Sequence, residues 1–292
     1  MTLVSKGSDR GIGRVVTLGA PRPSFIGEGH EAVTVVEPGD YARTDPFIAL
    51  MDDRLDLLPG RRAGEAHPHA GFETVTFVLE GSLRDRDEGT LEAGDVLWMT
   101  AGSGVIHNED VVTIGRTRIL QLWLKLPSDA RWAPPRVQSI KRESVPVVRA
   151  PGVEARVYSG RSGDAIASTL NYTPTTIVDV HLSAGATFDQ ELPGSYSGFA
   201  YVLDGGIIAG AERTQVKSGQ VAWLSDATSQ SGAVLHVTAG AGGCRFVLYA
   251  GERQGVPIVS HGPFIGESRA DLIRISNDYI GGKMPRVSQL PH

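Results

Sequence analysis

Two stretches of the chain, residues 77–100 and 201–225, repeat the same order of residue types. Each opens on an aromatic residue followed by Val, Leu, an acidic residue and Gly, and each closes on a Val-x-Trp sequence. The matching glycines inside each copy lie 13 residues apart in the first copy and 14 apart in the second. In a chain of 292 residues, such a repeat predicts two homologous domains in tandem. We expect the boundary in the proline-rich stretch 127–139, which gives the domains 1–135 and 136–292.

Runs of alternating apolar residues between turn residues predict an all-β fold for both domains. The 36 glycines and 17 prolines suit short strands joined by tight turns. Strand after strand at such intervals is typical of sandwiches and barrels, and the repeat favours two tandem β-barrels. Only two stretches have a helical pattern, a short one at 163–167 and a longer one at 268–279, where Ser268 can cap the first turn. The strand-like runs are residues 74–79, 96–100, 119–126, 176–182, 199–203, 221–224 and 245–250.

Composition narrows the class of protein. The net charge of -5 and the absence of a long basic run argue against direct nucleic-acid binding and against binding to anionic membranes. Residues 1–25 hold no continuous apolar stretch, and no run approaches the roughly 18 apolar residues of a membrane span, so we expect neither a signal peptide nor a membrane helix. Cys244 is the single cysteine, which excludes an intrachain disulfide and fits a reducing compartment. A cytoplasmic protein is the expectation.

Two pairs of polar residues predict a metal site in the first domain. His67 and His69 are separated by one residue, as are His107 and Glu109. Side chains at i and i+2 of a strand point to the same face, so a hairpin and its neighbour could bring both pairs together. A single His-x-His pair is more often a surface or core feature, but four such residues within a β-barrel pattern favour a metal centre. Three imidazoles and one carboxylate suit Fe(II), Mn, Ni, Cu or Zn better than Ca or Mg.

Four motifs resemble those of the pirin family of the cupin superfamily. They are "RTDPFIALMDD" (43–53), "HPHAGFETVTFVLEG" (67–81), "GDVLWMTAGSGVIHNE" (94–109) and "HGPFIG" (261–266). The resemblance implies two tandem cupin barrels of jelly-roll type with a short C-terminal helix. It also implies Fe(II) in the N-terminal barrel, held by His67, His69, His107 and Glu109.

Glu73 lies outside the ligand set that the resemblance implies. Many cupins use a glutamate four residues after the second histidine, and Glu73 stands there. In pirins the ligand is instead the glutamate after the third histidine, here Glu109. Because Glu73 is an even number of residues from His69, we expect it to face the cavity from behind the ligands.

The chain departs from the pirin pattern beside the first motif. Pirins often carry arginine where this chain has Ala70, and aspartate where it has Glu65 and Ala66. We therefore expect a less charged mouth that favours apolar aromatic molecules.

The second copy of the repeat lacks the predicted ligands. An offset of 124 residues places Glu191 and Pro193 at the positions of His67 and His69. With one inserted residue, Gly232 and Val234 would match His107 and Glu109. The range 136–292 is therefore expected to be a degenerate cupin barrel without metal.

The resemblance implies a dioxygenase of quercetinase type, which opens flavonols with O2. In that role Glu109 would be the catalytic base, and Phe72, Val75 and Trp98 would line a pocket for a small aromatic substrate. One alternative is an iron-containing, redox-sensing regulator that acts through a protein partner. A weaker one is a purely structural barrel protein with Zn.

Overall fold

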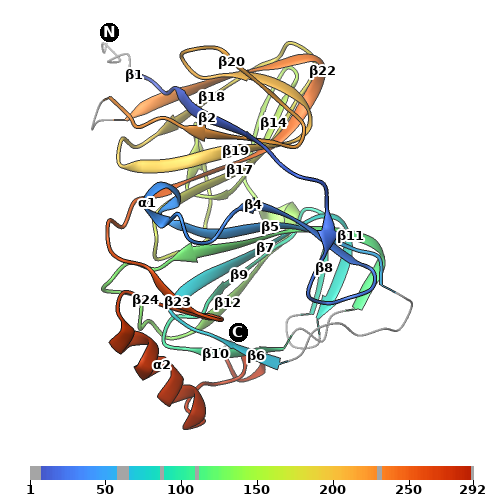
Figure 1. Cartoon of the computed structure of the whole chain (residues 1–292). Helices are drawn as coiled ribbons and strands as arrows, with labels where there is room; N and C mark the ends of the chain where they lie inside the picture. Colours follow the sequence, from blue (N-terminus) through green and yellow to red (C-terminus); the bar gives the residue numbers. More distant parts are fainter. Residues whose placement is uncertain (1–7, 58–65, 86–88, 109–111, 229–231, 291–292) are drawn as a thin grey trace. The chain divides into compact units, whose positions relative to one another are not determined.

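The computed structural model describes residues 8–57, 66–85, 89–108, 112–228 and 232–290. The described chain is mostly β-strand, with one 12-residue helix near its C-terminus (Figure 1). The predicted all-β class and the predicted C-terminal helix are confirmed. None of the described helices is long and apolar enough to cross a membrane.

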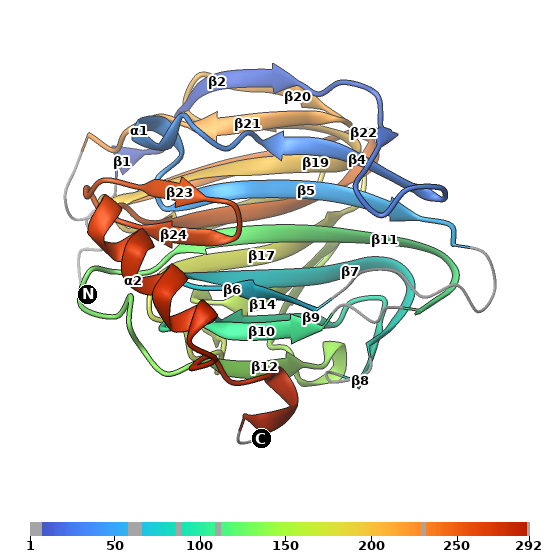
Figure 2. The same ribbon diagram turned by 60° about the horizontal axis from the view of Figure 1, so that its bottom comes forward.

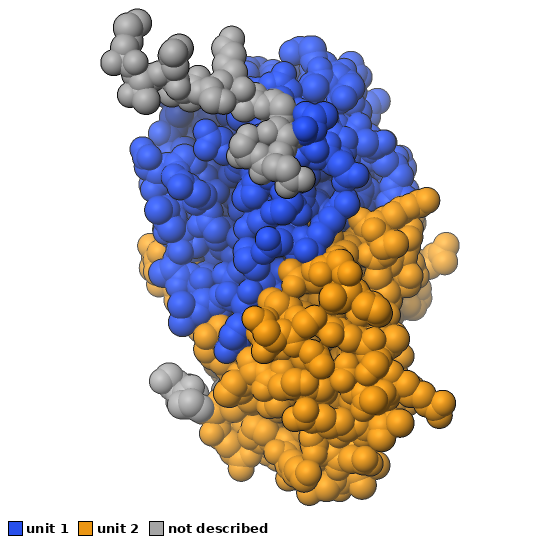
Figure 3. Space-filling model, turned by 90° about the vertical axis from the view of Figure 1, so that its left-hand side faces the viewer, with its two compact units in different colours: residues 1–18, 145–253 blue, residues 19–144, 254–292 orange. Residues whose placement is uncertain are grey.

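The chain forms two compact units, coloured separately in Figure 3. Residues 19–144 and 254–292 make up the unit that contains the first repeat, and residues 1–18 and 145–253 make up the unit that contains the second. We call them the first-repeat unit and the second-repeat unit. This division differs from the expected consecutive ranges 1–135 and 136–292, because each end of the chain belongs with the more distant repeat. The terminal segments resemble neither repeat, so the sequence comparison could not assign them.

The first-repeat unit has one sheet of eight strands and two short two-stranded sheets. The sheet order is β12-β9-β7-β11-β5-β4-β3, with β8 paired to β7. One two-stranded sheet joins β6 to β10, and the other joins β23 to β24. Its strands are β3 (Arg22–Pro23), β4 (His30–Val36), β5 (Phe47–Leu55), β6 (Ala66–His69), β7 (Phe72–Asp85), β8 (Gly89–Glu92), β9 (Val96–Thr100), β10 (Val105–Asn108), β11 (Val112–Lys125), β12 (Arg136–Ile140), β23 (Val259–His261) and β24 (Phe264–Gly266), and its helices are α1 (Tyr41–Thr44), α2 (Arg269–Ile280), η1 (Arg142–Ser144) and η2 (Val287–Gln289).

The second-repeat unit is built on a ten-stranded sheet. The order is β13-β14-β17-β22-β19-β21-β2, with β1 and β18 paired to β22 and β20 paired to β19. Strand β2, from the beginning of the chain, thus forms an edge of the sheet of the second repeat. The strands are β1 (Ser8–Asp9), β2 (Ile12–Thr17), β13 (Val147–Ala150), β14 (Val153–Ser159), β15 (Arg161–Ser162), β16 (Ala165–Ile166), β17 (Thr175–Leu182), β18 (Thr187–Leu192), β19 (Tyr196–Ala209), β20 (Thr214–Lys217), β21 (Gln220–Leu224) and β22 (Ala233–Glu252).

Matching strands of the two units give the true correspondence of positions. Strands β7 and β19 match with the predicted offset of 124, so Phe77 corresponds to Tyr201. Leu120 of β11 pairs with Phe77, and Val247 of β22 pairs with Tyr201. Strand β11 therefore matches β22 with an offset of 127. His67 pairs with His107 in β10, and Glu191 pairs with Val234 in β22. Val234 therefore matches His107, and His236 matches Glu109. The expected single inserted residue was wrong, since three residues are inserted before this point. We call the pairs β6–β10 and β18–β22 the mouths of the two barrels.

The predicted helices had different outcomes. The longer one is helix α2, and the Ser268 side chain accepts a hydrogen bond from the backbone N–H of Asp271, as expected of a cap. The short helix predicted at 163–167 was wrong, because Ser162 pairs with Ala165 in the hairpin of β15 and β16. Gly163 has a φ of +53°, which suits a tight hairpin turn.

Apolar side chains fill both units, but the C-terminal segment adds to only one core. In the second-repeat unit, one large cluster joins strands from β14 to β22 around Val202, Leu235 and Phe246. In the first-repeat unit, Ala70 packs with Phe264, Ile275 and Met284. A neighbouring cluster sets Met99 and Val105 against Val287 and Leu290. The last segment of the chain therefore packs beside the mouth of the first barrel.

Candidate metal centre

The mouth of the first barrel brings the three predicted histidine ligands together. Strands β6 and β10 run side by side (Figure 2). In this pair, His67 lies directly opposite His107. The ring centroids are 4.6 Å apart for His67 and His69, 5.4 Å for His67 and His107, and 5.8 Å for His69 and His107. His107, which lies 38 positions after His69, thus joins His67 and His69 in one cluster of imidazoles.

A turn at Gly71 fixes the end of the His-Pro-His strand. Gly71 has a φ of +86°, and a Cβ atom there would lie 1.9 Å from the carbonyl oxygen of Ile265. The backbone N–H of Ile265 donates to the carbonyl oxygen of Ala70 at 3.0 Å, and that of Gly71 donates to Gly102 at 2.8 Å. Only glycine combines this conformation with so close an approach of two backbones. The hairpin β23–β24 thereby holds the position of His69.

Burial keeps His69 neutral. His69 is only 5% exposed. This burial is the main cause that lowers the pKa of His69 well below its ordinary value, and the neighbouring His67 and His107 lower it further. Its Nδ1 atom is buried and has no hydrogen-bond partner within the described residues. A neutral imidazole with a buried, unbonded ring nitrogen is what metal ligation requires, so this residue fits a metal.

The rest of the predicted ligand set is not established by this geometry. Glu109 lies outside the described residues. Among the residues that are described, no three His, Cys, Asp or Glu side chains are arranged to hold a metal ion. The ring of His67 lies at 81° to that of His69 and at 85° to that of His107. The four-residue site therefore stays a prediction, supported by proximity and burial.

Two aromatic rings border the histidines. Phe72 lies 5.3 Å from His69 and Trp123 lies 5.7 Å from it, while the two aromatic rings are 4.5 Å apart. Of the three residues expected to line the pocket, only Phe72 is placed there by these contacts. Val75 is three positions further along the same strand, so it points to the opposite face, and its strand partner Trp98 does the same.

Trp123 is the wall residue that the sequence prediction did not assign. It lies opposite Thr74 in the sheet, on the face that carries Phe72. The one available signal was the alternation along 119–126, which could not show what packs against that face.

Glu73 does not face the histidines as expected. It follows Phe72 directly, so alternation places it on the opposite face of β7, where it accepts a hydrogen bond from the Thr100 hydroxyl at 2.6 Å. Counting an even number of residues from His69 failed because Gly71 interrupts the strand between them.

Ala70 is not at the mouth either. It is fully buried against Phe264, Ile275 and Met284, so the missing arginine leaves a packed methyl group rather than a less charged rim. Glu65 lies outside the described residues, and Ala66 is exposed.

A buried ion pair ties the C-terminal segment to strand β11. Lys125 is 1% exposed and donates to Glu267 at 3.0 Å, and the Ser128 hydroxyl donates to the same carboxylate at 2.7 Å. Burial alone would raise the pKa of Glu267, but the hydrogen bonds from Ser128 and Lys125, with the charges of Lys125 and Arg131, lower it overall. Glu267 precedes helix α2, so this pair holds the helix and the hairpin before it against the first barrel.

Known proteins share these features. The Pirin family model matches residues 33–124, and the model of the Pirin C-terminal cupin domain matches residues 177–285. Pirin-like protein 2 of Arabidopsis thaliana is 34% identical over 268 residues, which cover 88% of this chain and 81% of that protein. The structure of a quercetin 2,3-dioxygenase from Acinetobacter baumannii is similar with a TM-score of 0.81 and 26% identity, over 94% of this chain and 98% of that one.

A more distant structure shares the fold. It is the bacterial pirin YhhW of Escherichia coli in complex with nickel(II), with a TM-score of 0.59 and 17% identity over 82% of this chain and 99% of that one. The two family models fall on the two repeats found in the sequence, and each repeat is one unit of the structure. This chain therefore belongs to the pirin family, as a protein of two cupin domains.

Proposed function

We propose that this protein is a metal-dependent dioxygenase of quercetinase type, with Fe(II) held by His67, His69, His107 and Glu109. The observation that carries the proposal is the cluster of three histidine rings within 5.8 Å, whose buried member His69 is held neutral. The similarity to the Acinetobacter baumannii quercetin 2,3-dioxygenase supports a flavonol as the substrate class and O2 as the co-substrate.

The donor set suits several metals. Imidazole and carboxylate ligands favour Fe(II), Mn, Ni, Cu or Zn over Ca or Mg, and the nickel-bound pirin supports a transition metal in this family fold. When bound, Fe(II) would supply Lewis acidity that lowers the pKa of a coordinated hydroxyl, together with a redox-active centre for reaction with O2.

The side chains at the mouth would bind and orient a flat aromatic molecule. Phe72 and Trp123 form an apolar wall beside His69 and would pack against the rings of the substrate. Glu109 would accept the proton of the substrate hydroxyl, since a carboxylate at hydrogen-bond distance is a suitable general base. His69 would stay neutral throughout, because its burial opposes protonation.

A turnover assay tests the proposal. Protein loaded anaerobically with Fe(II) should consume O2 and bleach the long-wavelength absorbance of quercetin. The matched control is a His181→Ala/His236→Ala variant, which removes two exposed histidines of the second-repeat unit and should retain activity. If O2 uptake across a set of flavonols and catechols does not exceed that of free Fe(II), the enzyme hypothesis is wrong. A partner affinity that depends on the oxidation state of the metal would then favour the regulator.

A further inference from the structure

The mouth of the second barrel contains a cavity that the proposed reaction does not use. Its volume is about 1000 Å³, and it is lined entirely by residues of the second-repeat unit. Glu191 and Val234, which match His67 and His107, both line it, as does Pro193, which matches His69. The cavity therefore occupies the place in the second barrel that the histidine cluster occupies in the first.

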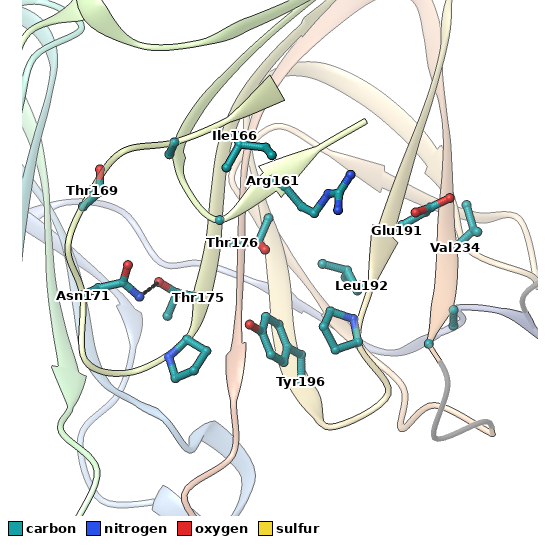
Figure 4. A pocket seen from close by; sticks show the side chains of 16 residues that line it. Arg161, Ile166, Thr169, Asn171, Thr175, Thr176, Glu191, Leu192, Tyr196 and Val234 are labelled. Carbon is teal, nitrogen blue, oxygen red and sulfur yellow. Dashed lines mark hydrogen bonds between the residues drawn. The ribbon is translucent and has the colours of Figure 1, made fainter. Parts of the chain in front are cut away.

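The polar groups around this cavity include both hydrogen-bond donors and hydrogen-bond acceptors. Figure 4 shows Arg161, Leu192 and Tyr196 around its middle, with Glu191 at one side. Within the described residues, the Arg161 side chain makes one hydrogen bond, to the carbonyl oxygen of Gly163, and the Glu191 carboxylate and the Tyr196 hydroxyl make none. The N–H groups of Arg161 can thus donate to a ligand, Glu191 can accept, and Tyr196 can do either.

Tyr196 is held in place from behind. Buried Arg10 donates from its backbone N–H to the carbonyl oxygen of Val234 at 2.8 Å, and its guanidinium donates to the carbonyl oxygen of Tyr196. Burial first, and then the charge of Glu252, raises the pKa of Tyr196, so its phenol stays protonated and can donate. Arg10 thus anchors the backbone of Tyr196, and the protonated phenol can donate to a ligand that carries electron-rich oxygen atoms.

One exposed apolar side chain borders the cavity. Seven large apolar side chains of the described chain are exposed, and one of them, Ile166 (63% exposed), lines the cavity. Together with the buried Leu192, it supplies apolar contact for the body of a ligand.

We propose that the mouth of the second barrel is a metal-independent binding site for a hydroxylated aromatic molecule. The aromatic body packs against Leu192 and Ile166, while its oxygen atoms accept hydrogen bonds from Arg161 and Tyr196. Arg161 and Glu191 balance each other in charge, so neutral polyphenols bind better than strongly charged ligands. The site goes beyond the proposed dioxygenase activity and depends on none of its residues.

Calorimetric titration of quercetin into the metal-free His67→Ala/His107→Ala variant tests the site separately from turnover. We expect one quercetin bound per chain. Arg161→Ala, added to this variant, should weaken binding roughly tenfold through the loss of a charge-assisted hydrogen bond, and Tyr196→Phe should weaken it by a smaller factor. Flavone, the parent ring system without hydroxyl groups, should bind more weakly than quercetin.

Arg149→Ala is the matched control, since Arg149 is an exposed arginine of the same unit outside the cavity, and it should leave the affinity unchanged. Circular dichroism checks that each variant is folded. The proposal is overturned if the metal-free variant shows no saturable binding, if Arg161→Ala and Tyr196→Phe both leave the affinity unchanged, or if flavone binds as tightly as quercetin. Loss of turnover alone would not affect it.

Discussion

The two mouths are built on matching strand pairs, yet their side chains differ in kind. The first presents three clustered histidines beside Phe72 and Trp123. The second presents a cavity with Glu191 and Val234 at the corresponding strand positions. Strand pairing is preserved in both, because the apolar residues of the sheets carry it. A cupin barrel of this sequence therefore does not need histidines at its mouth in order to fold, and their presence in one copy calls for a chemical explanation.

The largest expected effect is on metal content. His67→Ala/His107→Ala should remove nearly all bound metal, because two of four ligands are lost, while the barrel stays folded on its apolar core. Elemental analysis of the purified protein checks this, and the wild type should hold about one metal per chain. Two equivalent tight sites per chain would contradict the difference between the mouths, and an unchanged metal content in the double variant would disprove the ligand assignment.

The next effect is on turnover. Glu109→Gln should lower the rate by roughly 10²–10⁴, the range for losing a general base. Glu73→Gln is the control in the same barrel, and it should cost much less, because Glu73 lies on the face of β7 opposite Phe72. Initial rates of O2 uptake at matched iron content distinguish the two. Equal losses in both variants would show that Glu109 has no special role.

A smaller effect is expected on stability. Lys125→Ala should lower the free energy of unfolding by about 3 kcal/mol, because it leaves the carboxylate of Glu267 poorly compensated. The second barrel has Glu252 at the matching position, so this anchor belongs to the first barrel alone. Urea denaturation measures the change. Arg116→Ala breaks an exposed ion pair of the same unit and should have little effect.

The smallest effect is a pH dependence in the second barrel. His236, at the position that matches Glu109, contacts Asp189 at 2.8 Å and Asp9 at 3.3 Å. The hydrogen bond that His236 donates to Asp189 is the largest cause that raises the pKa of His236, and the charges of both aspartates add to it despite some burial. A raised pKa in the folded state stabilises the protein below the ordinary pKa of 6.5, and this stabilisation is lost as the pH rises through the folded value.

His236→Ala should therefore lower the melting temperature slightly at about pH 5.5 and hardly at all at about pH 8.5. Thermal unfolding at the two pH values measures the difference between the wild type and the variant. A larger loss at the higher pH would contradict the assigned sign.

The sequence correctly predicted the features that depend on residues close together in the chain. Alternation along 96–100 and 176–182 marked strands, and Ser268 marked the start of helix α2. The two-residue spacing of His67 and His69 correctly indicated a shared neighbourhood, since the rings lie together. These features depend on residues within one strand or one helical turn, so the sequence contains them directly.

Contacts between residues far apart in the chain could not be predicted from the sequence in this way. The wall contact of Trp123 depends on its register with Thr74, which is set across the sheet. The orientation of Glu73 depends on Gly71, whose positive φ starts a new strand and resets the alternation. The match of His236 to Glu109 depends on an insertion that only strand pairing locates. In each case a contact between distant residues decides the outcome.

Each terminal segment of the chain belongs to the unit of the more distant repeat, and this affects the order in which the two barrels can be completed during synthesis. A chain leaves the ribosome with its N-terminus first. Strand β2 emerges long before its partner β21, and the histidines of β6 and β10 emerge long before Ile265 and Pro285, whose backbones bond to the residues beside them. Strand β2 must therefore wait for β21, and the mouth of the first barrel must wait for residues that are made after the second repeat. Until those residues leave the ribosome, the histidine strands lack the backbone hydrogen bonds between Ala70 and Ile265 and between Ile106 and Pro285.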